Sequence, residues 1–330
     1  MSHHPPLART LVCATFLALV ALVGASPANA QEFPARPLRL IVPQPPGGGF
    51  DLVGRVVASK LSELLGQQVI VENKTGAGTL VGTEAAAKAP ADGYTLVVGG
   101  FSNIAANVGL YKQLPYDPVT DFVPVGMVVS YGYALVGRKD LPFGTLRELI
   151  AYARQNPGKL SYASGGVGTG QHIAGAALAQ ATETSLLHVP YRGAQAAYQD
   201  LLSGRVDLFF DNAGTAKQYV DTSQVKAYAV STLERFPGLP ALPTVNETGV
   251  GKVQVEAWFG IFTRAGVPPQ ALARLRTELS KASQSPDVLG RFEKGGGRML
   301  RMSTQEAEAF VRAEVAKWST MIREAGISAD

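Results

Sequence analysis

Cysteine and histidine are scarce in this chain. Its 330 residues include one cysteine, Cys13, and four histidines. Cys13 lies in an apolar segment near the N-terminus, so the remaining sequence has no disulfide, no thiol nucleophile and no cysteine metal ligand. Beyond residue 30 the histidines are His172 and His188. Because a metal site needs three or four converging ligands, the sequence predicts neither a metal nor a cofactor.

Catalytic motifs are also missing. None of the patterns H-E-x-x-H, G-x-S-x-G and G-x-x-x-x-G-K-[ST] occurs, and the glycine-rich loops do not spell G-x-G-x-x-G. Without a plausible pair of nucleophile and base, an exported enzyme is the weaker hypothesis. The formal net charge is +4, and no run of five like charges appears, which argues against a nucleic-acid partner.

The N-terminus has the pattern of a signal peptide. Arg9 precedes an uncharged apolar run at residues 11–25, and Ala28, Asn29 and Ala30 form the small-x-small sequence of a cleavage site. The run is too short for a comfortable membrane span. We therefore predict that residues 1–30 are removed after Ala30 and that residues 31–330 function in a bacterial periplasm.

Short apolar runs then alternate with segments of helical periodicity, and glycine or proline turns separate them. Alternating strands and helices predict an α/β protein with a mostly parallel sheet, whose ligand lies beyond the carboxyl ends of the strands. The predicted strands are residues 38–42, 69–71, 94–98, 122–129, 133–136, 160–163, 186–189, 206–210, 225–230 and 256–262. The predicted helices are residues 52–65, 81–89, 145–156, 171–182 and 194–202, a helix beginning at Pro269, and a last helix from Ser303 to about Gly326.

The strand and helix pattern occurs twice, which predicts two lobes. Residues 31–132 and 254–330 would form the first lobe, and residues 133–253 would form the second. The chain then passes twice between the lobes, which makes a two-crossing hinge. Residues 111–121 are expected to be a loop.

Glycine-rich loops follow several predicted strands. The first, at residues 43–51, contains Gly47, Gly48 and Gly49 before a helix, and Asp51 stands where an N-cap would. Backbone amides at a helix N-terminus favour an anion, although a tight βα turn would need the same glycines. Further loops at residues 74–79, 99–103 and 164–170 make a ligand site at the strand ends the stronger interpretation.

Several side chains near these loops have two interpretations. Ser102 and Asn103 either offer donors to a ligand or form a turn, and Thr169 either donates to a ligand or only caps its helix. His172 suits either a ligand contact or a packing role. His188 lies in an apolar strand and is expected to be buried and hydrogen-bonded.

Charged and aromatic candidates remain equally open. Arg192 either clamps a carboxylate or is simply exposed. Asp211 either bonds a ligand or caps the next helix. Phe50 and Phe101 either form an apolar wall against the ligand or belong to the core.

Taken together, the loops resemble a known family, the substrate-binding receptors of tripartite tricarboxylate transporters, also called Bug-type periplasmic solute-binding proteins. The resemblance covers nearly all of the sequence beyond residue 30. It is carried by VPQPPGGGFD, LGQQVIVENKTGAGTLVG, ADGYTLVVG, LPYDPVTDFVPV, NPGKLSYASGGVGTGQHIAG, HVPYRGAQAAYQDLLSGRVDLFFDN, WFGIFTRAGVP and EVAKWSTMIREAGI.

The resemblance implies a fold like that of type II periplasmic binding proteins, with a ligand cleft between two lobes. It implies a monomeric receptor that captures a small carboxylate and delivers it to membrane permease subunits. A ligand sensor that feeds a signalling partner is the alternative. The implied ligand-binding positions are Gly48, Gly49, Asp51, Gly76, Ala77, Gly78, Thr79 and Ser102 in the first lobe, and Ser164, Gly168, Thr169, His172, Tyr191, Arg192, Gly193, Asp211 and Asn212 in the second.

Some positions depart from the family pattern. Thr75 stands where proline is usual and Thr79 where glycine is common. Phe50 replaces a small or hydroxylated residue, and the pair Gly100 and Phe101 replaces a more polar one. The two phenylalanines predict an apolar or aromatic carboxylate as the ligand.

Overall fold

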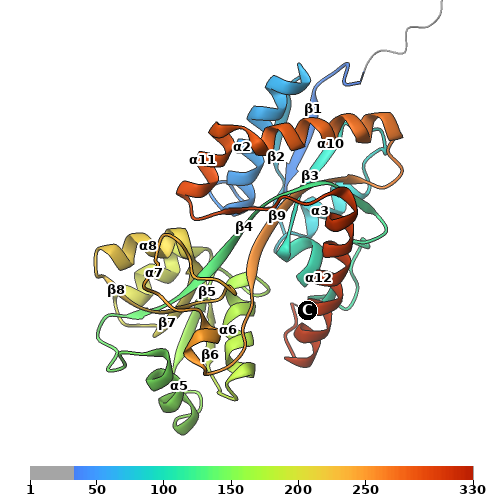
Figure 1. The fold of residues 1–330 in the computed structure, drawn as a ribbon. Coiled ribbons are helices and arrows are strands. Elements are labelled where there is room, and N and C mark those ends of the chain that lie inside the picture. Colours follow the sequence, from blue (N-terminus) through green and yellow to red (C-terminus); the bar gives the residue numbers. More distant parts are fainter. Residues whose placement is uncertain (1–32, 330) are drawn as a thin grey trace, which may run out of the picture.

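The computed structural model describes residues 33–329, and the chain has two lobes of mixed helix and strand (Figure 1). The predicted signal peptide, residues 1–30, lies outside the described residues. The two-lobed α/β architecture expected from the sequence is confirmed.

In the first lobe three parallel strands lie in the order β2-β1-β3. They are β1 (Leu38–Val42), β2 (Val69–Asn73) and β3 (Thr95–Gly100). Helix α2 (Gly49–Leu65) follows β1, and α3 (Leu80–Ala87) follows β2. Because β1 is central and covered on both faces, it consists almost entirely of aliphatic residues, as parallel strands do.

Strand β4 (Phe122–Arg138) runs through both lobes. Residues 122–132 pair with β9 (Glu256–Arg264), whereas residues 133–138 pair with β7 (Leu208–Asn212) and β8 (Val225–Val230). The predicted break between two strands at residues 130–132 is therefore wrong. Ser130 and Tyr131, which lie between the two predicted strands, are both buried and paired with β9.

The sheet is mixed, which corrects the prediction of a mostly parallel one. Its strand order is β2-β1-β3-β9-β4-β7-β5-β6, with β8 and β10 also paired to β4. Strand β9 returns from the second lobe and runs antiparallel to both β3 and β4. The two crossing strands therefore place antiparallel pairs between the parallel pairs of each lobe.

The second lobe repeats the alternation around β5 (Ser161–Ser164), β6 (Leu187–Pro190) and β7, which are parallel. Its helices are α5 (Leu146–Gln155), α6 (Gly170–Ala181), α7 (Ala194–Leu202), α8 (Ala213–Asp221) and α9 (Val245–Thr248). The predicted capping box is confirmed, because Thr145 caps α5 and Glu148 bonds back to the Thr145 amide. Helix α9 was not predicted, and α8 was implied only by the interpretation that Asp211 caps a following helix.

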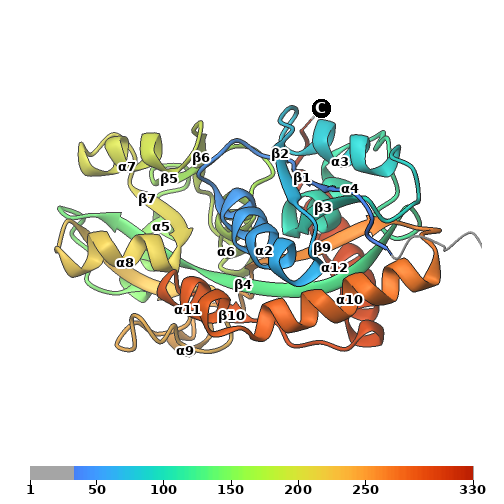
Figure 2. The same ribbon diagram turned by 90° about the horizontal axis from the view of Figure 1, so that it is seen from above.

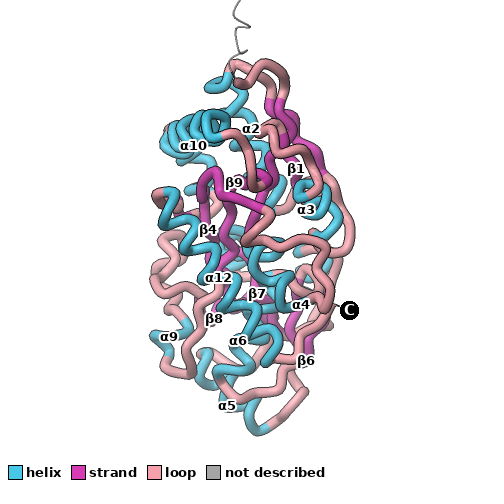
Figure 3. The backbone as a smooth tube through the Cα atoms, turned by 90° about the vertical axis from the view of Figure 1, so that its right-hand side faces the viewer, coloured by secondary structure: helices cyan, strands magenta, loops and turns pink. Residues whose placement is uncertain are grey.

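The C-terminal segment returns to the first lobe. It contains α10 (Pro269–Gln284), α11 (Pro286–Lys294), β10 (Arg298–Met299) and α12 (Thr304–Glu324). Helices α10 and α11 pack beside α2 on one side of the sheet (Figure 2). Helix α12 packs on the other side, against η1 (Phe101–Ala106) and α4 (Asn107–Leu110) (Figure 3). The sequence predicted a loop where η1 begins, because Gly99 and Gly100 precede it.

A carboxylate fixes α12 to the crossing strand β9. Oε2 of Glu314 accepts hydrogen bonds from the indole Nε1 atoms of Trp258 in β9 and Trp318 in α12, both at 2.8 Å. The Trp318 ring also meets the Phe101 ring edge-on, with centroids 5.0 Å apart. This part-buried cluster joins α12, β9 and η1, so α12 stabilises both the hinge and the end of β3.

Glu314→Ala is expected to lower the free energy of unfolding by about 1–3 kcal/mol, because two indole N–H groups lose a charged acceptor. Glu314→Gln keeps an acceptor oxygen and should lose less. Urea unfolding of both variants measures the difference. Equal losses in the two variants would show that Glu314 acts by packing and not by accepting these bonds.

Candidate functional site

The first candidate turn joins β1 to α2. Gly47 has a φ of 90°, and Gly48 is the N-cap of a helix that begins at Gly49. The first intrahelical bond runs from the Leu52 amide to the Gly48 carbonyl at 2.9 Å. The preceding amides therefore have no acceptor within the helix, and the helix dipole favours an anion beside them. The structure thus gives this turn the form of an anion site.

Asp51 is not the N-cap, and that prediction is wrong. It lies in the first turn of α2 with 5% of its surface exposed. Its carboxylate accepts bonds from the Gly47 amide, Arg55 Nε and Asn73 Nδ2 at 2.9–3.0 Å. Burial opposes ionisation, but these hydrogen bonds outweigh it and lower the pKa of Asp51. The contacts of Asp51 therefore stabilise the conformation of the turn.

The second turn, between β2 and α3, has three successive residues with positive φ. The values are 147° for Gly76, 43° for Ala77 and 72° for Gly78. A positive φ is costly at alanine and needs support from its surroundings. Tyr111 supplies support by donating its hydroxyl to the Ala77 carbonyl at 3.0 Å. Within residues 33–329, no hydrogen bond is donated by the amides of these three residues.

Thr79 directs its hydroxyl into the protein. The residue is 2% exposed, and its Oγ1 accepts a bond from Asn107 Nδ2 at 3.1 Å. Asn107 also donates to the Tyr116 hydroxyl at 2.9 Å. The side chain of Thr79 thus anchors α4, and its contribution to a ligand would come from the backbone. Asn107 was not among the predicted residues, because nothing in the sequence indicates that it is buried.

Asn103 is a structural residue, so its interpretation as a ligand donor is wrong. It is fully buried, with its Oδ1 accepting from the Gly100 amide at 2.8 Å and its Nδ2 donating to Thr83 Oγ1 at 3.0 Å. Asn103 thereby holds the end of β3 against α3. Ser102 beside it is half-buried, and its ligand contact stays a prediction.

The two phenylalanines belong to the core. Phe50 is 3% exposed and packs on Phe259, and Phe101 is 2% exposed and packs on Trp318; in both pairs the ring centroids are 5.0 Å apart. The prediction of an apolar wall is wrong, since these rings are covered by other side chains. The sequence argument for an aromatic ligand loses its support.

The loop between β5 and α6 is held largely by its own side chains. The amide of Gly166 donates to Ser164 Oγ at 3.1 Å, and that of Gly168 donates to His172 Nδ1 at 3.1 Å. Thr169 caps α6 as expected, its Oγ1 accepting from the His172 amide at 3.4 Å. The amide of Gly165 donates to Gln171 Oε1. This loop therefore has fewer free amides than the turns of the first lobe.

His172 and His188 stack with ring centroids 3.8 Å apart and planes at 6°. His188 Nε2 lies 2.7 Å from Ser164 Oγ, so His188 is hydrogen-bonded as predicted, although it is half-buried. Burial lowers the pKa of both rings to about 4, and the neighbouring His188 adds to the shift of His172. Both rings are therefore neutral at pH 7, which His172 Nδ1 requires in order to accept from Gly168.

Asp211 is the residue before the last one of β7, and it holds a neighbouring side chain by a hydrogen bond. It is 2% exposed, and its Oδ1 accepts from Gln171 Nε2 at 2.9 Å. Burial raises the pKa of Asp211 to about 6. Asn212, not Asp211, caps α8 by accepting from the Gly214 amide at 3.0 Å. Gln171 was missed in the sequence, since only the fold brings it between Asp211 and the glycine loop.

The turn between β6 and α7 holds two more candidates. Tyr191 donates its hydroxyl to Asp200 Oδ2 at 2.9 Å. Arg192 is exposed and makes no ion pair with the residues that the structure describes. Gly193 is the N-cap of α7, with a φ of 97°. Of the second-lobe candidates, Arg192 offers the available positive charge.

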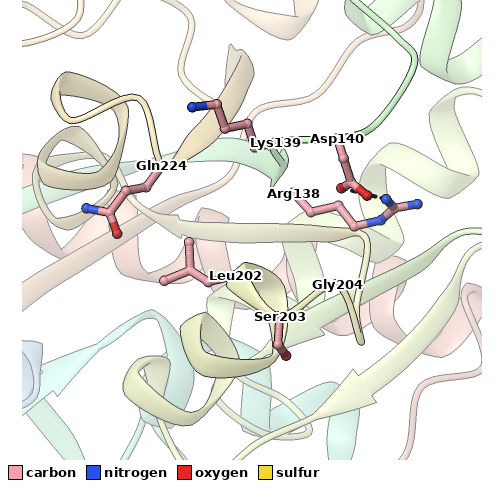
Figure 4. A pocket seen from close by; sticks show the side chains of 7 residues that line it. All are labelled: Arg138, Lys139, Asp140, Leu202, Ser203, Gly204 and Gln224. Carbon is pink, nitrogen blue, oxygen red and sulfur yellow. Dashed lines mark ion pairs between the residues drawn. The ribbon is translucent and has the colours of Figure 1, made fainter.

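A surface hollow of about 290 Å³ lies elsewhere on the second lobe (Figure 4). It is lined by Arg138, Asp140 and Gly204 among others, and by none of the predicted site residues. The Arg138 guanidinium pairs with Asp140 at 2.6 Å and with Asp207 at 2.9 Å. Because these two carboxylates already neutralise the Arg138 guanidinium, Arg138 is poorly placed to bind a carboxylate in this hollow.

Within residues 33–329, no group of three or more histidine, cysteine, aspartate or glutamate side chains is arranged to hold a metal ion. No helix in this range is both long and apolar enough to cross a bilayer.

Acidification is expected to destabilise the protein through His172. The folded-state pKa of about 4 lies below the unfolded value of 6.5, so the stability is full above pH 6.5 and is lost as the pH falls towards 4. Between pH 7.5 and pH 5 this residue should cost about 1–2 kcal/mol. Urea unfolding at the two pH values checks this.

The matched variant for this test is His172→Gln, which does not titrate. Its unfolding free energy should depend less on pH than that of the unmodified protein. The comparison removes the contribution of Asp211, whose raised pKa favours the folded state on acidification. The same pH dependence in both proteins would contradict the assignment.

Known proteins resemble this chain along its length. BugT of Bordetella pertussis is 33% identical over 303 residues, which are 92% of this chain and 93% of that protein. The structure of R. palustris Rpa4515 with adipate has a TM-score of 0.81 and 32% identity, and the match covers 89% of this chain and 99% of that one. MatC (Rpa3494) from Rhodopseudomonas palustris with bound malate gives 0.79 and 31%, with 88% and 100% covered.

The family comparison agrees with these relatives. Residues 53–327 match the family described as the tripartite tricarboxylate transporter family receptor. The match includes both lobes and the loops described above except the first turn, which lies before residue 53. The chain therefore belongs to the tripartite tricarboxylate transporter receptor family, the Bug-type periplasmic solute-binding receptors.

Proposed function

We propose that this protein is a periplasmic receptor that binds a small dicarboxylate and delivers it to the permease of a tripartite transporter. The observation that carries the proposal is the pair of turns in the first lobe whose amides, apart from that of Gly47, have no acceptor within the described residues. One turn is the N-terminus of α2, and the other is the segment from Gly76 to Gly78. Backbone amides bind a carboxylate without a counter-charge.

The proposed ligand class rests on the ligands of two similar proteins and on the burial of two phenylalanines in this chain. Two family members were solved with adipate and with malate, which are both dicarboxylates. Phe50 and Phe101 are buried in this chain, so they give no reason to prefer an aromatic ligand. One carboxylate would bind the turns of the first lobe, and Arg192 of the second lobe would supply a positive charge for the other.

The proposed contacts in the first lobe are Gly48, Gly49, Gly76, Ala77, Gly78 and Thr79 through the backbone, and Ser102 through its hydroxyl. Those in the second lobe come from the loops that contain Ser164, Gly168, Thr169, Tyr191 and Arg192. Asp51, His172 and Asp211 would support these loops, because each of them already accepts a hydrogen bond from the protein. Bridging waters would complete the site at little entropic cost.

We also propose the lobe boundaries that the sequence indicates, namely residues 31–132 with 254–330, and residues 133–253. The pairing of β4 supports them, since its partner changes from β9 to β7 and β8 between Gly132 and Tyr133. Ligand binding would close the lobes about β4 and β9 by adding contacts to both. Removal of residues 1–30 and a monomeric state complete the proposal.

Binding of malate and adipate, measured by thermal shift and calorimetry, tests this function. At 100 times its dissociation constant a ligand adds about 2.7 kcal/mol of stability, which is easily visible. Benzoate and the uncharged diamide of adipic acid serve as contrasts and should give much smaller shifts. Equal shifts with the diamide, or no shift with any carboxylate while mass spectrometry finds no co-purified ligand, would overturn the proposal.

Arg192→Gln is expected to weaken binding of the preferred dicarboxylate by about tenfold, because the ligand loses one charged contact. A tenfold change in affinity corresponds to about 1.4 kcal/mol of binding free energy. The matched control is Arg312→Gln, which removes an exposed arginine on α12, away from the loops. Calorimetry on both variants gives the ratio. Equal affinities in the two variants would exclude Arg192 as a ligand contact.

A further inference from the structure

The last residue of α4 meets the glycine loop of the other lobe. A Cβ built on Gly168 would lie 2.5 Å from Leu110 Cδ1, 3.5 Å from Cδ2 and 3.6 Å from Cγ. Gly168 belongs to the loop between β5 and α6 in the second lobe, and Leu110 ends α4 in the first. The Leu110 side chain therefore rests directly on the backbone of Gly168. Leu110 is 3% exposed, so it has little room to move aside.

The first-lobe side of this contact is held firmly. The carbonyl of Leu110 accepts a bond from the Ala329 amide at 3.1 Å, which ties α4 to the segment after α12. One turn earlier, Asn107 bonds both Thr79 and Tyr116. Figure 3 shows α4 lying beside α12. Because Thr79 belongs to the second glycine turn, α4 connects that turn mechanically to the Leu110 side chain.

The second-lobe side is held as well. Gly168 has a φ of 76°, and its amide donates to His172 Nδ1 at 3.1 Å. His172 is stacked on His188, which in turn is hydrogen-bonded to Ser164. The backbone that receives Leu110 is thus fixed by side chains of β5, β6 and α6. Two braced elements in contact define how closely the lobes approach each other.

We propose that Leu110 and Gly168 form the interlobe stop that sets the closed arrangement of the lobes. Glycine is required at position 168 because any side chain would separate the loop from Leu110. The contact involves neither of the amide-rich turns of the first lobe. Gly168 belongs to a second-lobe loop that is proposed to contact the ligand, so the distance between the lobes is the measurement that isolates the stop. Helix α4 carries both Leu110 and Asn107, and Asn107 is bonded to Thr79. The turn between β2 and α3 is therefore connected through α4 to the second-lobe loop and should move together with the stop.

The test uses Gly168→Ala, Leu110→Ala and the double variant. Gly158→Ala is the matched control, since Gly158 also lies in the second lobe with a φ of 72° and has nothing within 4 Å of its would-be Cβ. It carries the same kind of backbone strain without the steric contact. The full chain with Cys13→Ser and spin labels at Gln68→Cys and Gln180→Cys, one exposed site on each lobe, reports the distance between lobes.

Gly168→Ala should shift the distance distribution towards a more open form than Gly158→Ala does. Overpacking of this kind opposes the closed form, so the affinity for malate or adipate should be about 5- to 150-fold weaker. Adding Leu110→Ala removes the obstructing methyl groups, so the double variant should recover the distance distribution. Leu110→Ala alone should broaden the distribution, because the stop is lost.

Two results would overturn the proposal. One is that Gly168→Ala opens the lobes no more than Gly158→Ala does. The other is that the double variant recovers nothing. The distance measurement needs no ligand, so it is independent of the proposed function. If Gly168→Ala changes the distance between the lobes while no carboxylate binds, the interlobe stop is supported and the proposed function is not. If carboxylates bind while the distance does not change, the interlobe stop is wrong.

Discussion

Every backbone group of strand β4 needs a hydrogen-bond partner, and the strand obtains its partners from both lobes. Its first part pairs with β9, and its last residues pair with β7 and β8. A buried strand cannot leave these groups unpaired without a large loss of stability, so the places of its neighbours β7, β8 and β9 follow from the course of β4. The two series of parallel strands end at the level where β4 changes partners, which brings their loops within reach of one another, as the contact of Gly168 with Leu110 shows.

The loops of the two lobes use their amides differently. In the first lobe the turns before α2 and α3 keep amides without protein acceptors, and buried side chains such as Asp51 and Asn103 support them from behind. In the second lobe the amides of Gly166 and Gly168 are bonded by neighbouring side chains. A ligand would find open donors on the first lobe and a braced surface on the second, which suits a receptor that binds first to one lobe and then closes.

Much of the fold was predictable because it depends on local chemistry. Strands 38–42 and 225–230 and helix 194–202 agree with the structure residue for residue, and the capping boxes at Thr145 and Ser303 begin helices as expected. Hydrophobic periodicity and side-chain caps act over a few residues, so they can be recognised in a single sequence. The errors fall where distant segments decide. Ser130 fell between two predicted strands but pairs with β9, and Phe50, for which the sequence left a ligand wall and the core open, packs against Phe259.

The sequence by itself determined the α/β alternation, the two lobes, the glycine-rich turns and the absence of a cysteine site beyond Cys13. These depend on composition and on short-range patterns. Only the tertiary structure decided that β4 is continuous, that Asp51, Asn103 and Asp211 support loops through buried hydrogen bonds, and that Leu110 meets Gly168. The physical reason is that the burial and the hydrogen bonds of a residue depend on residues that are distant in the sequence. Those residues come close only when the chain has folded.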